Sequence, residues 1–375
     1  MRRIRVNFLS NGHFINDDLI YYRYAVTLAK SGVEVKIFAR NINNTKEFKF
    51  SSITLYGIVP ENTNRFLRLL YYPFKIFIAS LRHPADVYII CTPALLPLGI
   101  IYKILRKRVI YNAQENFRVK FEDRNWIPRP IIGFLSKIER FLGNQMDGII
   151  VTDSISASNY KAEKTIVLPN YPTSDDLLDS ESLLQNKCND KKDFNMVYIG
   201  GISKNRGLEI FRKLIKKLPK NFYIHLYGRF SSKEEERSIS NEKRIFYHGN
   251  VDHKELMVKI REYDLGLCIF ENVPAYRYSA ENTTKLFEYM KSGLPVVVSN
   301  FPGLKKIIED GKCGIVVDPN DIDETARLIE ELSKDKVKLN ELKKNSYNAF
   351  LTKYNWDIYE KLLIEFVSKI YTSST

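Results

Sequence analysis

The chain has 375 residues, with 58 lysines and arginines against 44 aspartates and glutamates, for a net charge of +14. This length exceeds what one hydrophobic core usually organises, so we expect two domains. The first 168 residues hold 25 of the basic and 13 of the acidic side chains, so most of the excess positive charge lies in the N-terminal half. A basic half suits an anionic membrane surface or a phosphorylated substrate. Because the chain carries no zinc-finger, RNA-recognition or bZIP signature, we expect no nucleic-acid partner.

The cysteines and the apolar stretches of the sequence indicate in which cellular compartment the protein works. The four cysteines are widely separated and form no CxxC pair, which favours a reducing cytoplasm. The N-terminal apolar stretch contains Arg5, so it does not read as a secretory signal. No run of about 18 uncharged apolar residues occurs, so we expect no transmembrane span. We therefore expect a cytoplasmic protein, either soluble or peripheral at the inner face of the membrane. The cysteines are Cys91, Cys188, Cys268 and Cys313.

The first half predicts a parallel sheet wound with helices. A strand at residues 4–9 leads into a turn with Gly12, a helix that ends at Gly32, and a second strand at 33–39, which together form a βαβ unit. A polar, aspartate-rich segment at residues 171–193 is predicted to be a linker. The further strands predicted before this linker lie at residues 87–91, 108–111, 148–151 and 165–168.

The second half repeats the alternation of strands and helices. Its predicted strands lie at residues 195–199, 222–227, 244–248, 265–270, 296–299 and 314–317. Its predicted helices lie at residues 208–218, 254–263, 285–291 and 322–332. The expected fold class is α/β, with two Rossmann-like, doubly wound parallel-sheet domains. We expect an N-terminal domain at residues 1–170, the linker, and a C-terminal domain at 194–375 that includes a C-terminal helix.

The strongest local signal is the stretch 285–299, which reads Lys-Leu-Phe-Glu-Tyr-Met-Lys-Ser-Gly-Leu-Pro-Val-Val-Val-Ser. It predicts a short helix that ends at Gly293 and turns into a buried strand. Packing accounts for the glycine and the valines but not for Glu288 between two aromatic residues. The free N–H groups at the start of such a helix are a favourable place for phosphate. The capping candidates before the helix are Asn282, Thr283 and Thr284.

A second signal is the stretch 198–208, which reads Tyr-Ile-Gly-Gly-Ile-Ser-Lys-Asn-Arg-Gly-Leu. A predicted strand runs into Gly200 and Gly201, and the cations Lys204 and Arg206 follow before a helix begins. Backbone N–H groups and cations at such a turn can converge on a diphosphate. Solvated surface side chains remain the alternative reading of the two cations.

Together these stretches resemble the donor-binding signature of glycosyltransferase family 4 and its GT-B relatives. The resemblance continues in order through residues 226–229, 248–251 and 309–319, and so covers about residues 195–330. It implies the GT-B fold, in which two Rossmann-like domains face a central cleft, and a nucleotide-diphosphate-sugar donor. It implies that Glu288 grips the ribose hydroxyls and that Lys204 and Arg206 neutralise the leaving diphosphate. The donor-binding residues that it suggests are Gly12, Gly200, Gly201, Gly228, Arg229, Val251, Asn282, Thr283, Thr284, Lys285 and Glu288.

The N-terminal half resembles the family at two further places. Residues 11–13, Asn-Gly-His, resemble its first glycine-containing loop, and residues 109–116 resemble a strand end that often reads Asp-x-His-Glu. Here Gln114 stands in place of the histidine, so an amide that can position a sugar replaces a titratable imidazole. Relatives often carry two glutamates with seven residues between them, but counting back from Glu288 places Ala280 at the first position, and Glu281, one place off, is the candidate to substitute for it. The acceptor-side residues that the resemblance suggests are His13, Asn112 and Glu115.

The resemblance implies a retaining glycosyltransferase with Lys204, Arg206, Gln114 and Glu281 as catalytic candidates. Such enzymes assemble capsule, O-antigen and other surface polysaccharides on saccharide or polyprenyl-diphosphate-linked acceptors. The histidines show no metal-ligand spacing, so we expect neither a metal nor another cofactor. The stretch 65–82 is aromatic, basic and free of acidic residues. It predicts contact with an anionic membrane surface, although core packing with exposed cationic tips is an equal alternative.

Two other functions remain open. A nucleotide-sugar epimerase of the same fold would turn over its donor without an acceptor. A catalytically weak partner subunit would bind nucleotide-sugar in support of another transferase, and the departures at Gln114 and Ala280 are its only support.

Overall fold

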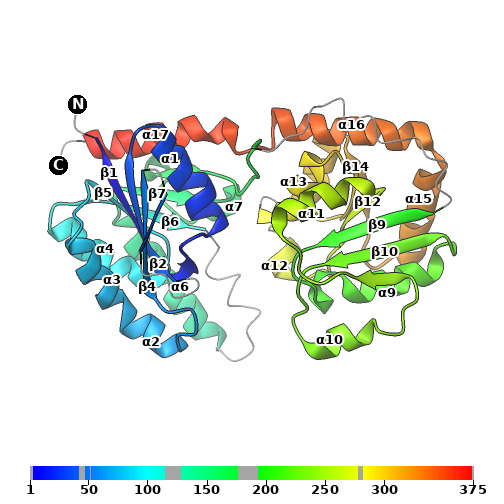
Figure 1. Cartoon of the computed structure of the whole chain (residues 1–375), viewed down its shortest axis with the longest axis horizontal. Coiled ribbons are helices and arrows are strands. Elements are labelled where there is room, and N and C mark those ends of the chain that lie inside the picture. The colour runs from blue at the N-terminus through cyan, green and yellow to red at the C-terminus, as the bar shows by residue number, and fades with distance from the viewer. Residues whose placement is uncertain are drawn as a thin grey trace. The chain divides into compact units, whose positions relative to one another are not determined.

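The computed structural model describes residues 3–41, 47–50, 52–114, 128–175, 193–277 and 282–373. The chain divides into two compact units, shown in Figure 1. Unit 1 comprises residues 1–170 together with 356–375, and unit 2 comprises residues 171–355. The division after residue 170 falls where the sequence places the end of the first domain. Residues 356–375, which the prediction grouped with the second domain, instead belong to unit 1.

Unit 1 is built on an eight-stranded sheet with the order β3-β4-β2-β1-β5-β6-β7-β8. All of its pairings are parallel except that of β3 with β4 at one edge, which is antiparallel. The strands are β1 (Arg5–Phe14), β2 (Glu34–Arg40), β3 (Glu47–Phe50), β4 (Ile53–Val59), β5 (Val87–Ile90), β6 (Arg108–Ala113), β7 (Gly148–Val151) and β8 (Thr165–Val167). The sequence did not predict β3 and β4, and β1 continues five residues beyond its predicted end.

Helices cover both faces of this sheet. Successive residues such as Phe8 and Leu9 fall in different apolar clusters because side chains alternate across a strand. One cluster packs against η1, α1 and α17, and the other against α3 and α4. The unit is therefore doubly wound, as predicted. Its helices are η1 (Asp18–Ala25), a π-helix, with α1 (Val26–Lys30), α2 (Arg65–Leu70), α3 (Tyr72–Leu81), η2 (Pro93–Leu95), α4 (Leu96–Ile104), α6 (Arg129–Asn144), α7 (Ser154–Ala157), η3 (Ala162–Lys164) and α17 (Asp357–Thr372).

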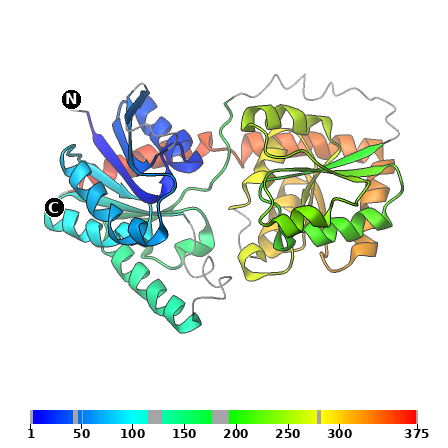
Figure 2. The same cartoon turned by 60° about the horizontal axis from the view of Figure 1, so that its bottom comes forward.

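The last helix belongs to unit 1 because Trp356 anchors it there. The indole of Trp356 is fully buried, lies 5.3 Å from the ring of Tyr24, and donates from Nε1 to Oγ1 of Thr27 at 2.9 Å. The Thr27 hydroxyl in turn donates to Oε1 of Glu360 at 2.9 Å. In Figure 2 the red C-terminal helix lies beside the blue N-terminal elements of this unit. The apolar face of α17 thus completes the core of the N-terminal sheet.

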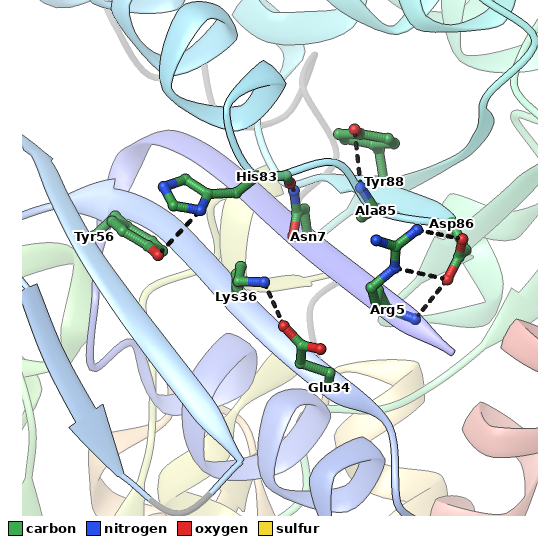
Figure 3. Close-up of polar contacts among 9 residues, drawn as sticks. All are labelled: Arg5, Asn7, Glu34, Lys36, Tyr56, His83, Ala85, Asp86 and Tyr88. Carbon is green, nitrogen blue, oxygen red and sulfur yellow. Dashed lines mark hydrogen bonds and ion pairs between the residues drawn. The ribbon is translucent and has the colours of Figure 1, made fainter. Parts of the chain in front are cut away.

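A cluster of polar contacts closes the amino-terminal edge of the same sheet (Figure 3). Arg5 donates to the carboxylate of Asp86 from its backbone N, Nε and Nη2, at 3.0, 3.2 and 3.0 Å. Nδ2 of Asn7 donates to the carbonyl of His83 at 2.8 Å, and the backbone N–H of Ala85 donates to the Tyr88 hydroxyl at 3.1 Å. These bonds tie β1 to the turn that precedes β5. The cluster is structural, because its polar groups satisfy one another.

Unit 2 is built on a six-stranded, fully parallel sheet with the order β11-β10-β9-β12-β13-β14. Its strands are β9 (Phe194–Ile199), β10 (Phe222–Tyr227), β11 (Ile245–Tyr247), β12 (Leu265–Cys268), β13 (Val296–Ser299) and β14 (Gly314–Val317). Its helices are η4 (Lys204–Arg206), α9 (Leu208–Lys217), α10 (Lys233–Ser238), α11 (His253–Lys259), η5 (Ile260–Glu262), α12 (Pro274–Arg277), α13 (Thr284–Lys291), α14 (Pro302–Gly311), α15 (Ile322–Lys334) and α16 (Lys336–Thr352). The predicted α/β fold class with two Rossmann-like sheets is confirmed. Of the predicted linker, residues 176–192 lie outside the described residues.

Candidate functional site

A cavity of about 660 Å³ opens in unit 2 at the carboxyl edge of its sheet. Its walls come from the ends of β9, β10 and β12 and from the first turns of α11 and α13. Ligands bind at this edge of open α/β sheets because the loops and helix N-termini converge there. The cavity is lined by Ile199, Gly200, Arg206, Tyr227, Gly228, Asn250, Val251, Asp252, His253, Leu256, Phe270, Tyr276, Asn282, Thr283, Thr284, Lys285 and Glu288.

Two glycines form a backbone wall of this cavity. Gly200 has a φ of +103° and Gly228 a φ of +134°, conformations that residues with a side chain rarely adopt. A Cβ atom on Gly228 would also overlap the carbonyl oxygen of Gly200. The ends of β9 and β10 can therefore approach each other only through glycine. The result is a wall of main-chain groups that a ligand can contact closely.

Arg206 is held against the cavity by contacts on two sides. Its Nε donates to the hydroxyl of Tyr276 at 2.9 Å, and its Nη1 donates to the carbonyl of Gly201 at 3.3 Å. The next residue, Gly207, has a φ of +93° and turns the chain directly into α9. These contacts fix a guanidinium at the cavity wall, where it can pair with an anion.

Lys204, the other predicted cation of this turn, is exposed and does not line the cavity. Its backbone N–H donates to Oε1 of Glu235 at 2.7 Å. Gly201 packs against the guanidinium of Arg206 and does not line the cavity. Arg229 is exposed and does not line the cavity either. The structure therefore brings Arg206 to the cavity and leaves Lys204, on the same turn, and Arg229, after β10, outside its lining.

Lys285 stands in the first turn of α13 with its amino group buried. Its Nζ lies 3.5 Å from the ring centroid of Tyr198 and 5.5 Å from that of Phe270. No described residue offers it a hydrogen-bond acceptor. Burial, with a smaller contribution from the Arg206 charge, lowers the pKa of Lys285 to about 7.

Glu288 lies one turn further along α13 and faces the same cavity. Its Oε1 lies 2.8 Å from Nε2 of His253, the first residue of α11. The Glu288 side chain is 14% exposed, whereas that of His253 is 62% exposed. The carboxylate can therefore accept hydrogen bonds from hydroxyl groups of a ligand, with the imidazole beside it.

The neighbouring Tyr289 fixes the position of α13. Its fully buried hydroxyl accepts a hydrogen bond from the backbone N–H of Ile199 at 3.0 Å and donates to the carbonyl of Val197 at 3.1 Å. Its ring packs so closely on Gly266 that a Cβ atom there would overlap it. These two hydrogen bonds hold α13 against β9, in the position where Lys285 and Glu288 line the cavity.

Sequence reasoning missed several lining residues, among them His253, Tyr276 and Phe270. His253 follows Val251, which was predicted, and Tyr276 belongs to a short helix before the predicted signature. The contact of His253 with Glu288 and that of Tyr276 with Arg206 depend on how separate helices pack, and no local sequence pattern encodes such packing.

The predicted residues of unit 1 that the structure describes lie near the carboxyl ends of β1 and β6, the two strands that flank β5. Gly12 and His13 each donate a backbone N–H to Oγ of Ser10, at 3.2 and 2.9 Å, and Nδ1 of His13 lies 2.9 Å from the same oxygen. Asn112 is buried with its Nδ2 3.8 Å from the sulfur of Cys91, and its Oδ1 has no partner among the described residues. The backbone carbonyl of Gln114 accepts from the Thr152 hydroxyl at 2.7 Å, and its buried Nε2 likewise has no described partner.

Glu115 and Glu281 lie outside the described residues, so their predicted acceptor and catalytic roles stay predictions. Among the described residues no group of three or more metal-ligating side chains occurs. The expectation that the protein uses no metal or cofactor also stays a prediction.

Two doubly wound α/β units, one of them with a glycine-walled cavity lined by an arginine, a lysine and a glutamate, agree with the GT-B fold that the sequence predicts. Residues 179–349 match the family model described as glycosyl transferases group 1. This match confirms, for the matched region, the family resemblance that the sequence motifs indicate.

Two curated relatives match parts of the chain. A sucrose synthase from Denitrovibrio acetiphilus is 39% identical over 85 residues, which are 22% of this chain and 11% of that protein. An uncharacterized 41.2 kDa protein in the cps region of Klebsiella pneumoniae is 25% identical over 244 residues, or 61% of this chain and 63% of that protein. The chain thus covers less than two thirds of either relative's length.

Solved structures match almost the whole chain. Sucrose-phosphate synthase from Thermosynechococcus elongatus has a TM-score of 0.77 at 16% identity, covering 99% of this chain and all of that one. Anabaena HepE in complex with UDP-glucose has a TM-score of 0.72 at 17% identity, covering 98% and 100%. WaaG, a glycosyltransferase involved in lipopolysaccharide biosynthesis, has a TM-score of 0.68 at 16% identity, with the same coverage. These similarities show the fold.

Proposed function

We propose that the protein is a retaining glycosyltransferase that binds a nucleotide-diphosphate-sugar in the cavity of unit 2 and transfers its sugar to a saccharide or lipid-linked saccharide. The observation that carries the proposal is the combination, in one cavity, of a glycine backbone wall, the basic side chains of Arg206 and Lys285, and Glu288. The glycine wall and the two basic side chains can bind a diphosphate, and Glu288 can bind the hydroxyl groups of a ribose.

The chemistry of the cavity fits the departure of a nucleoside diphosphate. Breaking the bond between the sugar and the phosphate leaves negative charge on the leaving group, and fixed positive groups stabilise that charge. Arg206 and the ammonium form of Lys285 provide two such groups, and the N-terminus of the eight-residue helix α13 adds the positive end of its dipole. Because these groups supply positive charge, the proposal gives no role to a metal.

Glu288 is proposed to hold the ribose. A carboxylate beside the phosphate site can accept two hydrogen bonds from the vicinal hydroxyls of a ribose. The family resemblance assigns the matching glutamate to this role, and the low exposure of Glu288 at the cavity wall agrees with it. His253 would orient the carboxylate from the other side.

UDP-sugars are the first donors to test, because a structural neighbour was solved with UDP-glucose. The relatives also support a role in surface polysaccharide synthesis, since one lies in a cps region and another acts in lipopolysaccharide biosynthesis. These descriptions belong to the relatives and enter here as support for the proposal.

The helices α2 and α3 are proposed to contact the anionic inner face of a membrane, where lipid-linked acceptors reside. Helix α2 has no buried residue, and Phe66 and Leu70 on it are 75% and 80% exposed. Arg68, Lys75 and Arg82 make no ion pair with a described residue, so their charge is free to meet lipid phosphates. Within the described ranges, no helix is long and apolar enough to cross a bilayer.

A thermal-shift panel of UDP-, GDP-, dTDP- and ADP-sugars tests the donor site. We expect one donor class to stabilise the wild type and to lose that effect in Glu288→Ala. Glu309→Ala is the matched control, because Glu309 is an exposed glutamate of α14 away from the cavity. Absence of stabilisation by every donor would overturn the proposal.

Product analysis then separates the three functions that the sequence left open. The proposed transferase releases nucleoside diphosphate only when an acceptor fraction is present. An epimerase converts the donor without an acceptor, and a partner subunit binds the donor but releases nothing.

A further inference from the structure

Lys285 has a buried amine that faces the cavity and has no hydrogen-bond acceptor among the described residues. Its Nζ has no hydrogen-bond acceptor among the described residues and lies over the face of Tyr198. The hydroxyl of Tyr198 is turned away and donates to the carbonyl of Gly201 at 2.8 Å. The nearest carboxylate on its own helix, Glu288, is engaged with His253.

The charged and titratable groups around Lys285 come from every element packed against it. They are Tyr198 on β9, Arg206 on η4, Cys268 on β12, Tyr276 on α12, Glu288 and Tyr289 on α13, and His253 on α11. Burial raises the pKa of Cys268 to about 12, and it also raises the pKa values of Tyr198 and Tyr289, so these groups stay neutral near pH 7. Arg206 stays charged and repels a second cation. The free cavity therefore disfavours the ammonium form of Lys285.

A nucleotide-sugar would reverse this balance. Its diphosphate carries two negative charges and has no group that titrates near neutral pH. Bound at the wall that Gly200, Arg206 and Lys285 share, it would supply the acceptor that the amine lacks. A hydrogen bond from an ammonium to a phosphate oxygen is charge-assisted and strongest in a buried site.

We propose that donor binding brings one proton from solvent to Lys285, and that the ammonium so formed pairs with the donor diphosphate. This inference rests on the proposed function and adds a property of the same site. The proton moves from solvent to Nζ when the donor binds and returns to solvent when the diphosphate leaves.

The sign of the pH dependence follows from linkage. In the free protein the pKa of Lys285 lies near 7, and in the complex the diphosphate raises it. The donor therefore binds tightest below pH 7, where the amine is already charged. Above pH 7 the affinity falls by about tenfold per pH unit, because each binding event must then take up a proton.

The experiment is isothermal titration of the intact protein with UDP-glucose, or with whichever nucleotide-sugar the panel selects. Titrations at pH 8 in two buffers of different ionisation enthalpy give the number of protons taken up. We expect about 0.9 proton for the wild type at that pH. Lys285→Arg, which stays charged, should bind with no uptake and with a flat profile between pH 6.5 and 8.5.

Lys285→Met should bind at least tenfold more weakly at pH 6.5 and also show no uptake. If it does not bind at all, Lys285→Arg still carries the test. His253→Gln controls for the other titratable side chain and should keep the uptake of one proton.

Donor binding by the wild type without proton uptake would overturn this inference and leave the proposed function standing. Uptake that persists in Lys285→Arg would also overturn it. Absence of any nucleotide-sugar binding would overturn both proposals.

Discussion

Nε2 of His253 lies 2.8 Å from Oε1 of Glu288, so the first residue of α11 meets the middle of α13 at the cavity wall. The contact joins residues 35 positions apart and holds the carboxylate in one orientation. Glu288→Gln keeps the shape of the side chain and removes its charge. We expect donor affinity to fall by about 10- to 100-fold, since hydrogen bonds to a charged group contribute about 1.5–3 kcal/mol. Calorimetry measures this change, and an unaltered dissociation constant would contradict the assignment.

Gly228 is expected to tolerate no side chain. In Gly228→Ala the new methyl group would overlap the carbonyl oxygen of Gly200, and the φ of +134° would be strained as well. Gly249→Ala is the matched control, because its φ is +73° but nothing lies within 4 Å of the added atom. We expect Gly228→Ala to be less stable than the control by about 1–3 kcal/mol and to lose donor binding. Equal denaturation midpoints for the two variants would show that the close approach is unimportant.

The contact between Arg5 and Asp86 is expected to serve stability alone. Asp86→Ala removes the acceptor of three hydrogen bonds at the amino-terminal edge of the unit 1 sheet. We expect a loss of about 1–3 kcal/mol in the free energy of unfolding, measured in urea, with no change in the donor dissociation constant. A marked change in donor binding would mean that this edge influences the cavity of unit 2.

The exposed apolar side chains of α2 are expected to mediate membrane binding. Phe66→Ser/Leu70→Ser should reduce flotation with vesicles that contain phosphatidylglycerol, because both side chains would lie in the lipid interface. Val337→Ser on α16 is the matched control, since its side chain is 82% exposed in unit 2. Raising the salt concentration should weaken binding by the wild type, because the attraction to anionic lipid is screened. Flotation that is equal for the double variant and the control would exclude α2 as the contact.

The strands with continuous apolar runs were predicted closely from the sequence. The predicted strand at residues 296–299 matches β13, and the predicted strand at 148–151 matches β7. The missed strand β4 is half-buried and pairs on one side with the antiparallel strand β3. Of its residues only Ile53, Leu55 and Val59 are buried, so its own sequence gave a weak signal.

The candidate site was predictable where local sequence fixes geometry. The spacing of Lys285 and Glu288 places both on one face of a helix, and both line the cavity. Lys204 and Arg206 share one 3-10 turn, where residues two apart point in different directions, so composition alone could not tell which cation faces inward. The pairing of His253 with Glu288 was not predictable, because it depends on how α11 and α13 pack.

The return of α17 to unit 1 has a consequence for the order of folding during synthesis. Domains generally fold in the order in which the ribosome releases them. Here the core of unit 1 needs Trp356 and the apolar face of α17, which emerge after unit 2, whereas unit 2 is one continuous segment. Unit 2 can therefore finish folding first, while one face of the N-terminal sheet, covered by η1 and α1, still lacks the part of its cover that α17 supplies.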